Sequence, residues 1–139
     1  MSARLLVTFD LFSALTDSAT GGADALGAIA AARGWTVTGA ELYAAWDTRN
    51  KAAQRTATAP TTFAEVSADA LAAAYDALGL DASRARADMG VVHGGVGEWP
   101  LWPDVADGVA TVAALPDVAA VGLLSNVDDA LARRTRAAG

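Results

Sequence analysis

The sequence predicts an α/β fold in which a small parallel sheet carries a long helical insertion. Two short apolar runs, residues 4–9 and residues 118–124, have the length and the branched side chains of buried parallel strands. The long stretch between them, residues 10–117, has mainly the apolar spacing of helices. We therefore expect two neighbouring strands that are joined by a helical crossover.

The first predicted strand ends abruptly in an acid, Asp10, which follows Phe9. A carboxylate at the carboxyl end of a parallel strand lies where open α/β sheets place ligands and chemistry. Aspartate is also common in the turns that follow strands. Taken alone, Asp10 is therefore as consistent with a turn as with a functional site.

Helices are predicted through the middle of the chain. Residues 23–33 carry one apolar face and stop at Gly34. Two further helices begin near Thr38 and Thr62, because each threonine has a glutamate three residues later, the spacing of a capping box. Asp104 is expected to begin another helix, whose valines face the sheet.

Two connecting segments are predicted between these helices. Residues 56–61 are polar, and residues 88–97 are rich in glycine but lack the spacing of a phosphate-binding loop, so a turn or hinge is expected there. His93, the single histidine of the sequence, lies in the second segment. Without partner residues nearby, it is predicted to be a solvated loop histidine and not a catalytic residue or ligand.

The second predicted strand ends at a hydroxyl and an amide, Ser125 and Asn126. A helical pattern follows from about Val127 towards the end of the chain, with acids in its first turn and arginines in its last turn. Asn126 is the expected N-cap of this helix. Ser125 should therefore lie at a strand end that faces a helix N-terminus, a favourable place for an anion.

These strand ends resemble the first two motifs of the haloacid dehalogenase (HAD) superfamily of hydrolases. Residues 9–15 resemble the first motif and residues 123–126 the second. Between them, residues 62–80 and 99–105 resemble the helical cap of the family and its return segment. The resemblance spans nearly the whole chain and is closest to the 2-haloacid dehalogenase branch.

The resemblance implies a chain of two parts. Residues 1–17 and 100–139 would form an incomplete HAD-type, Rossmann-like parallel sheet core, and residues 18–99 an inserted helical cap. The lysine and acidic motifs of the family follow the second strand, and the chain stops at Gly139 before any such segment. We therefore expect a truncated chain whose two strands cannot bury their apolar faces unaided.

The resemblance also implies a covalent hydrolytic mechanism. Asp10 matches the nucleophile, which forms an aspartyl ester that water then cleaves. Ser125 would be the second catalytic residue and would bind the anionic group of the substrate. Backbone N–H groups of Leu11, Phe12 and Asn126 would assist it.

The residue two positions after the nucleophile separates two branches of the family. HAD phosphatases have a second acid there, which protonates the leaving alkoxide, whereas this chain has Phe12. Such general acid catalysis is worth roughly 100- to 10,000-fold, and a halide leaves without it. Phe12 therefore favours a dehalogenase. The alternatives are a phosphatase-like hydrolase that takes its acid from elsewhere, and a truncated helical module without catalysis.

Two departures from the family pattern affect the predicted site. The family has a threonine or serine four residues after the nucleophile, where this chain has Ala14, with Ser13 as a neighbouring substitute. Dehalogenases also use an arginine of the helical cap to hold the leaving halide. The match offers Arg49 for this substrate-binding role, while another register places Asp47 there. Lys51, the only lysine, belongs to the cap-like region and cannot take the role of the motif lysine.

Composition narrows the classes of partner. The net charge of −6 disfavours nucleic acid, because phosphate binding needs clustered lysine and arginine. The absence of cysteine excludes disulfides and thiol nucleophiles. No stretch has the length and apolarity of a bilayer span, and no signal peptide is visible, so a cytoplasmic protein is expected.

The expected partner is therefore a small anionic substrate, without nucleic acid or membrane. A complementing C-terminal fragment and a homo-oligomer both remain open as protein partners. No metal site or cofactor is expected, and magnesium would be needed only in the phosphatase-like alternative.

Overall fold

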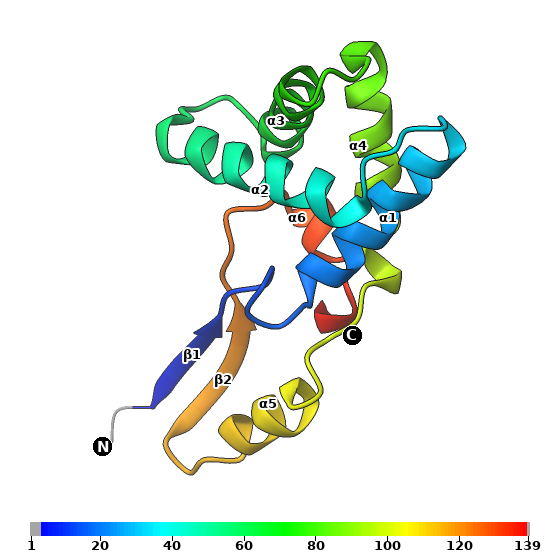
Figure 1. Ribbon diagram of the computed structural model, residues 1–139. Helices are drawn as coiled ribbons and strands as arrows, with labels where there is room; N and C mark the ends of the chain where they lie inside the picture. Colours follow the sequence, from blue (N-terminus) through cyan, green and yellow to red (C-terminus); the bar gives the residue numbers. More distant parts are fainter. Residues whose placement is uncertain (1–3, 139) are drawn as a thin grey trace.

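The computed structural model describes residues 4–138, and it confirms that the two end strands pair. Strand β1 (Leu5–Phe9) and strand β2 (Val118–Leu123) form a parallel sheet in which Phe9 lies opposite Leu123 (Figure 1). The Leu124 N–H donates to the Phe9 carbonyl at 2.8 Å and continues the ladder to the strand ends. The residues that follow the two strands therefore leave the sheet at the same edge.

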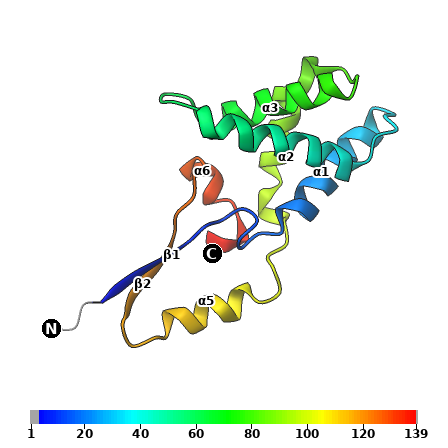
Figure 2. The same cartoon turned by 60° about the vertical axis from the view of Figure 1, so that its left-hand side comes forward.

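The helices fall into two groups. Four of them form a layer from which the strands project (Figures 1 and 2): α1 (Ser18–Ala32), α2 (Gly39–Thr56), α3 (Phe63–Ala77) and α4 (Ala85–Gly94). Helix α5 (Val105–Ala113) lies beside β2, and the short helix α6 (Asp129–Ala132) follows the second strand end. The fold is thus α/β, rich in helix, with a two-stranded parallel sheet.

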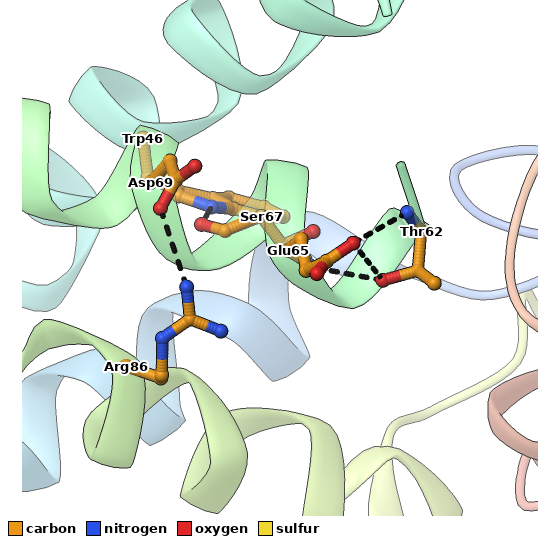
Figure 3. A network of polar contacts seen from close by, with 6 residues as sticks. All are labelled: Trp46, Thr62, Glu65, Ser67, Asp69 and Arg86. Carbon is orange, nitrogen blue, oxygen red and sulfur yellow. Dashed lines mark hydrogen bonds and ion pairs between the residues drawn. The ribbon is translucent and has the colours of Figure 1, made fainter. Parts of the chain in front are cut away.

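The predicted capping boxes fix where α2 and α3 begin. The Thr38 and Thr62 hydroxyls each accept from the backbone N–H three residues later, and the side chains of Glu41 and Glu65 accept in return from the threonine N–H at 2.8 Å. Figure 3 shows the second box. These hydrogen bonds stabilise the carboxylates and lower the pKa of both glutamates. At the end of α1, Gly34 has a φ of +68°, a conformation that favours glycine.

The hydrophobic core lies within the helical layer and not on the sheet. Leu26, Leu42 and Leu71, from three different helices, are completely buried. The Trp46 indole N–H donates to the Ser67 carbonyl at 3.0 Å, which attaches α2 to α3 (Figure 3). This attachment fixes the face of α2 that points towards the strand ends.

The strands remain largely uncovered, as the sequence predicts for a two-stranded sheet. Leu6 is 70% exposed and Leu124 is 69% exposed. Helix α5 packs along β2, whereas parallel sheets are usually covered on both faces. The division of the chain into residues 1–17 and 100–139 against 18–99 stays a prediction.

The turn or hinge predicted for residues 88–97 is wrong. Helix α4 continues through Gly94, and Met89 and Val92 are 1% exposed within the core. Glycine is weakly disfavoured inside helices, but here the burial of two apolar side chains outweighs that preference. His93 is consequently a helical residue.

The long helix predicted after Asn126 is also wrong. Helix α6 contains only four residues, its N-cap position is Asp128, and Asn126 lies outside it. The Asp128 carboxylate instead accepts from the N–H groups of Phe63 and Ala64 at 3.2 and 3.0 Å, at the start of α3. The side chain at the N-cap position of α6 therefore binds the first turn of α3, a helix that is distant in the sequence.

Candidate functional site

A cavity of about 190 Å³ lies where the two strand ends meet the helical layer. The predicted site residues Asp10, Phe12, Ser125 and Asn126 all line it. Drug-sized ligands occupy pockets of roughly 300–1,000 Å³, so this cavity suits a smaller molecule. The structure therefore brings together residues that are more than half the chain apart in sequence.

The Asp10 side chain is exposed and is fixed by its own backbone neighbour. The Leu11 N–H donates to Asp10 Oδ1 at 2.8 Å. This N–H was expected to contact substrate, and in the structure it holds the carboxylate instead. The Leu11 side chain is completely buried and does not line the cavity.

The turn after Asp10 places two hydroxyls at the cavity. Ser13 has a φ of 66°, the left-handed region that non-glycine residues rarely adopt. Its N–H donates to the Ser18 hydroxyl at 3.0 Å, and its carbonyl accepts from the Trp102 indole at 3.1 Å. Ser13 and Ser18 both line the cavity, whereas Ala14 does not.

Aromatic rings form an apolar wall of the cavity. Phe12 stacks on Phe63 with 6.4 Å between ring centroids and meets Trp99 edge-on at 5.8 Å. His93 also stacks on Phe63, with 5.7 Å between the ring centroids. Phe12 thus packs within this aromatic wall.

The end of the second strand lies at the cavity, but the helix N-terminus that was expected to face it is not there. Ser125 is half-buried, and Asn126 donates from Nδ2 to Gln54 Oε1 of α2 at 2.8 Å. Because α6 starts only at Asp129 and is one turn long, the favourable helix end predicted for an anion is not formed. Hydroxyl and amide groups remain as the polar groups of this end.

Arg49 is not among the residues that line the cavity. Its Nη1 donates to the Ala45 carbonyl of its own helix at 2.8 Å. Helix α2 instead presents Asp47 and Lys51, whose carboxylate and ammonium groups are 2.7 Å apart. Which of the two residues corresponds to the cap arginine of the dehalogenases stays a prediction.

Two further residues at the cavity were not predicted to contribute. His93 is half-buried in α4, and burial lowers its pKa although the nearby Asp128 carboxylate raises it. The prediction of a solvated loop histidine is therefore wrong. Tyr43 of α2 also lines the cavity, and burial together with the Asp47 charge raises its pKa to about 12. Both side chains are neutral near pH 7.

The spacing of residues along α2 identifies the face of the helix that lines the cavity. Tyr43, Asp47, Asn50, Lys51 and Gln54 recur at intervals of three or four residues and all line the cavity. Within residues 4–138, no three His, Asp or Glu side chains gather as a metal site would require. No helix in that range is long and apolar enough to cross a membrane.

Neither a protein-family model nor a curated protein matches the sequence. Solved structures do match. An L-2-haloacid dehalogenase from Xanthobacter autotrophicus is 23% identical with a TM-score of 0.69, covering 94% of this chain and 50% of that chain. The structure of that enzyme with chloropropionic acid covalently bound gives 20% identity and a TM-score of 0.67, covering 94% of this chain and 50% of that chain.

A defluorinating L-2-haloacid dehalogenase gives 23% identity and a TM-score of 0.76, covering 95% of this chain and 54% of that chain. This chain therefore spans about half the length of the enzymes it matches. Its strand pairing and helical layer share the fold of these L-2-haloacid dehalogenases, which is the fold that the resemblance of the two strand ends implies.

Proposed function

We propose that this chain carries the nucleophile-bearing part of a haloacid dehalogenase-type hydrolase, with Asp10 as the nucleophile. The observation that supports it most directly is the shared cavity: Asp10 and Ser125 follow adjacent parallel strands and line the same small space. The fold is that of enzymes named for the same reaction, one of which has been solved with chloropropionic acid bound covalently. The substrate class is a small 2-haloacid.

In the proposed reaction, one carboxylate oxygen of Asp10 forms a bond to the halogen-bearing carbon. The carbon–halogen bond breaks and the halide leaves with its electron pair. Water then attacks the carbonyl carbon of the resulting ester, releasing the 2-hydroxy acid, a proton and the Asp10 carboxylate. Because Leu11 N–H holds Oδ1, Oδ2 is the attacking oxygen.

The remaining lining residues bind and orient the substrate. The Ser125 hydroxyl and the backbone N–H of Asn126 donate hydrogen bonds to its carboxylate. The wall of Phe12, Phe63 and Trp99 contacts its carbon chain and halogen.

The test follows the bond to Asp10 directly. The purified chain is incubated with 2-chloropropionate, chloride release is measured, and the peptide that contains Asp10 is examined by mass spectrometry for the ester. Asp10→Asn should abolish both signals. Asp24→Asn, which removes an exposed acid of α1 outside the cavity, should leave both unchanged.

Several results contradict the proposal. Ester on another residue, chloride release that survives in Asp10→Asn, or neither ester nor chloride from the wild-type chain would each do so. The proposal also includes no metal cofactor, so chelation should not reduce chloride release. Magnesium-dependent hydrolysis of p-nitrophenyl phosphate that is lost in Asp10→Asn would instead indicate the phosphatase-like alternative.

A further inference from the structure

The charged groups that line the cavity are unbalanced for an anionic substrate. Asp10 and Asp47 are carboxylates, whereas Lys51 supplies the single cationic group among the lining residues of the described chain. His93 adds no charge near pH 7, because burial lowers its pKa. A substrate carboxylate that enters this space therefore meets repulsion unless Lys51 approaches it.

We propose that Lys51, and not Arg49, is the cation of α2 that binds the carboxylate of the substrate, with Asp47 as its resting partner. This inference rests on the proposed function for the identity of the substrate, a small 2-haloacid. The ammonium group exchanges the Asp47 carboxylate for the substrate carboxylate when the cavity fills. Lys51 is thus a binding residue of the cavity mouth.

Helix geometry separates the two candidate cations. Residues two positions apart point to nearly opposite sides of an α-helix, so Arg49 and Lys51 cannot face the same cavity. Lys51 shares the lining face with Asp47 and Gln54, which are four and three residues away. Arg49 donates to the Ala45 carbonyl of its own helix.

The resting ion pair is easy to exchange. Lys51 Nζ lies 2.7 Å from Asp47 Oδ2, in an i,i+4 pair whose side chains are 61% and 24% exposed. Exposed pairs of this kind are among the weakest ionic interactions in proteins. The four-carbon stem of lysine is flexible, so its ammonium group can turn towards the cavity and donate charge-assisted hydrogen bonds there.

Propionate, the substrate skeleton without a halogen, is the probe for this inference. Its binding is followed by the fluorescence of Trp46 and Trp99, which line the cavity. Lys51→Met should weaken propionate binding by about tenfold, the usual effect of losing a charged hydrogen bond, and Lys51→Arg should restore most of it. Asp47→Asn should tighten binding, because it removes a repelling charge and frees the ammonium group.

Two matched variants control for the loss of positive charge on the same helix. Arg49→Met and Arg55→Met should both bind propionate as the wild type does, since neither residue lines the cavity. A purely structural role for the Lys51–Asp47 pair predicts another pattern. Both Lys51→Met and Asp47→Asn would then lower the melting temperature alike and leave propionate affinity unchanged.

The inference is overturned if Lys51→Met binds propionate normally, if Arg49→Met is the variant that loses binding, or if the wild-type chain binds no propionate. Its failure is distinct from that of the proposed function. Ester formation on Asp10 that proceeds equally well in Lys51→Met refutes the role of Lys51 alone. Lysine-dependent propionate binding without any ester on Asp10 refutes the dehalogenase reaction and leaves a carboxylate-binding site.

Discussion

His93 shows how placement changes the chemistry of a single residue. Its ring stacks on Phe63, and burial penalises its charged form, so its pKa lies below the ordinary value. In the unfolded chain the same imidazole is fully hydrated and binds a proton more readily. The folded and unfolded states therefore bind different numbers of protons as the solution becomes acidic.

The stability of the fold should depend on pH through this residue. Above the unfolded pKa the histidine is neutral in both states, and below it the unfolded state gains a proton that the folded state resists, so stability falls as pH falls. His93→Phe retains an aromatic ring and should reduce the loss of unfolding free energy between about pH 7.5 and about pH 5.5. Urea unfolding at the two pH values measures it, and an unchanged loss in the variant contradicts the prediction.

Some residues of the site can be predicted from the short stretch of sequence around them, and others cannot. Asp10, Phe12, Ser125 and Asn126 follow strand patterns that are short and contiguous, and the structure places all four at one cavity. The neighbouring glycines predict a loop at His93, and its burial depends on the packing of α4. The partner of a side chain cannot be predicted from its immediate sequence when that partner lies in another element.

At the scale of elements, α1 and α2 approach each other through glycine. A Cβ added to Gly39 would lie 2.0 Å from the Ala23 carbonyl oxygen and 2.8 Å from Gly27 Cα. Both are backbone atoms that cannot move aside without shifting a helix. Gly90 in α4 is the opposite case, since nothing lies within 4 Å of its Cβ position.

Alanine at these two positions should have opposite effects. Gly39→Ala should destabilise the fold by about 1–3 kcal/mol, the usual cost of inserting a methyl group where there is no space for it. Gly90→Ala should stabilise it by about 0.5–1 kcal/mol, because alanine is the better helix former and has free space. Chemical denaturation of both variants checks the pair, and a neutral Gly39→Ala would show that the helices separate at little cost.

Elements whose boundaries depend on neighbouring residues were predictable. The capping boxes at Thr38 and Thr62 and the stop at Gly34 all lie where the sequence indicates. Helices α4 and α6 differ because tertiary contacts decide them. Burial of Met89 maintains α4 despite its glycines. Asp128, at the N-cap position of α6, bonds to the start of α3, a contact between elements that the local sequence does not indicate.

At the scale of the whole molecule, the apolar material is unevenly distributed. The helical layer contains the core, whereas Leu5 and Leu6 of β1 are 55% and 70% exposed, and Leu124, directly after β2, is 69% exposed. Exposed apolar surface of this kind on a sheet edge favours association with other apolar surfaces. Either of the protein partners that the sequence leaves open, a complementing fragment or a second copy, would cover it.

Apolar dyes should report this surface without any loss of structure. The wild-type chain is expected to bind anilinonaphthalene sulfonate, and Leu6→Thr with Leu124→Thr should reduce the dye fluorescence while leaving the near-UV circular dichroism intact. Leu78→Ser, which removes an exposed leucine beyond α3, is the control. Equal reduction by the control would place the dye elsewhere, and loss of the near-UV signal would indicate unfolding.

The segment after β2 connects two helices of the helical layer, α2 and α3, to the sheet. Asn126 is bonded to Gln54 of α2, and Asp128 is bonded to the first turn of α3. Ser125 is the residue next to the first of these tethers. A movement of the helices away from the strands must therefore either break both of these contacts or move Ser125 together with the helices. Entry of a molecule by that route would disrupt the cavity itself.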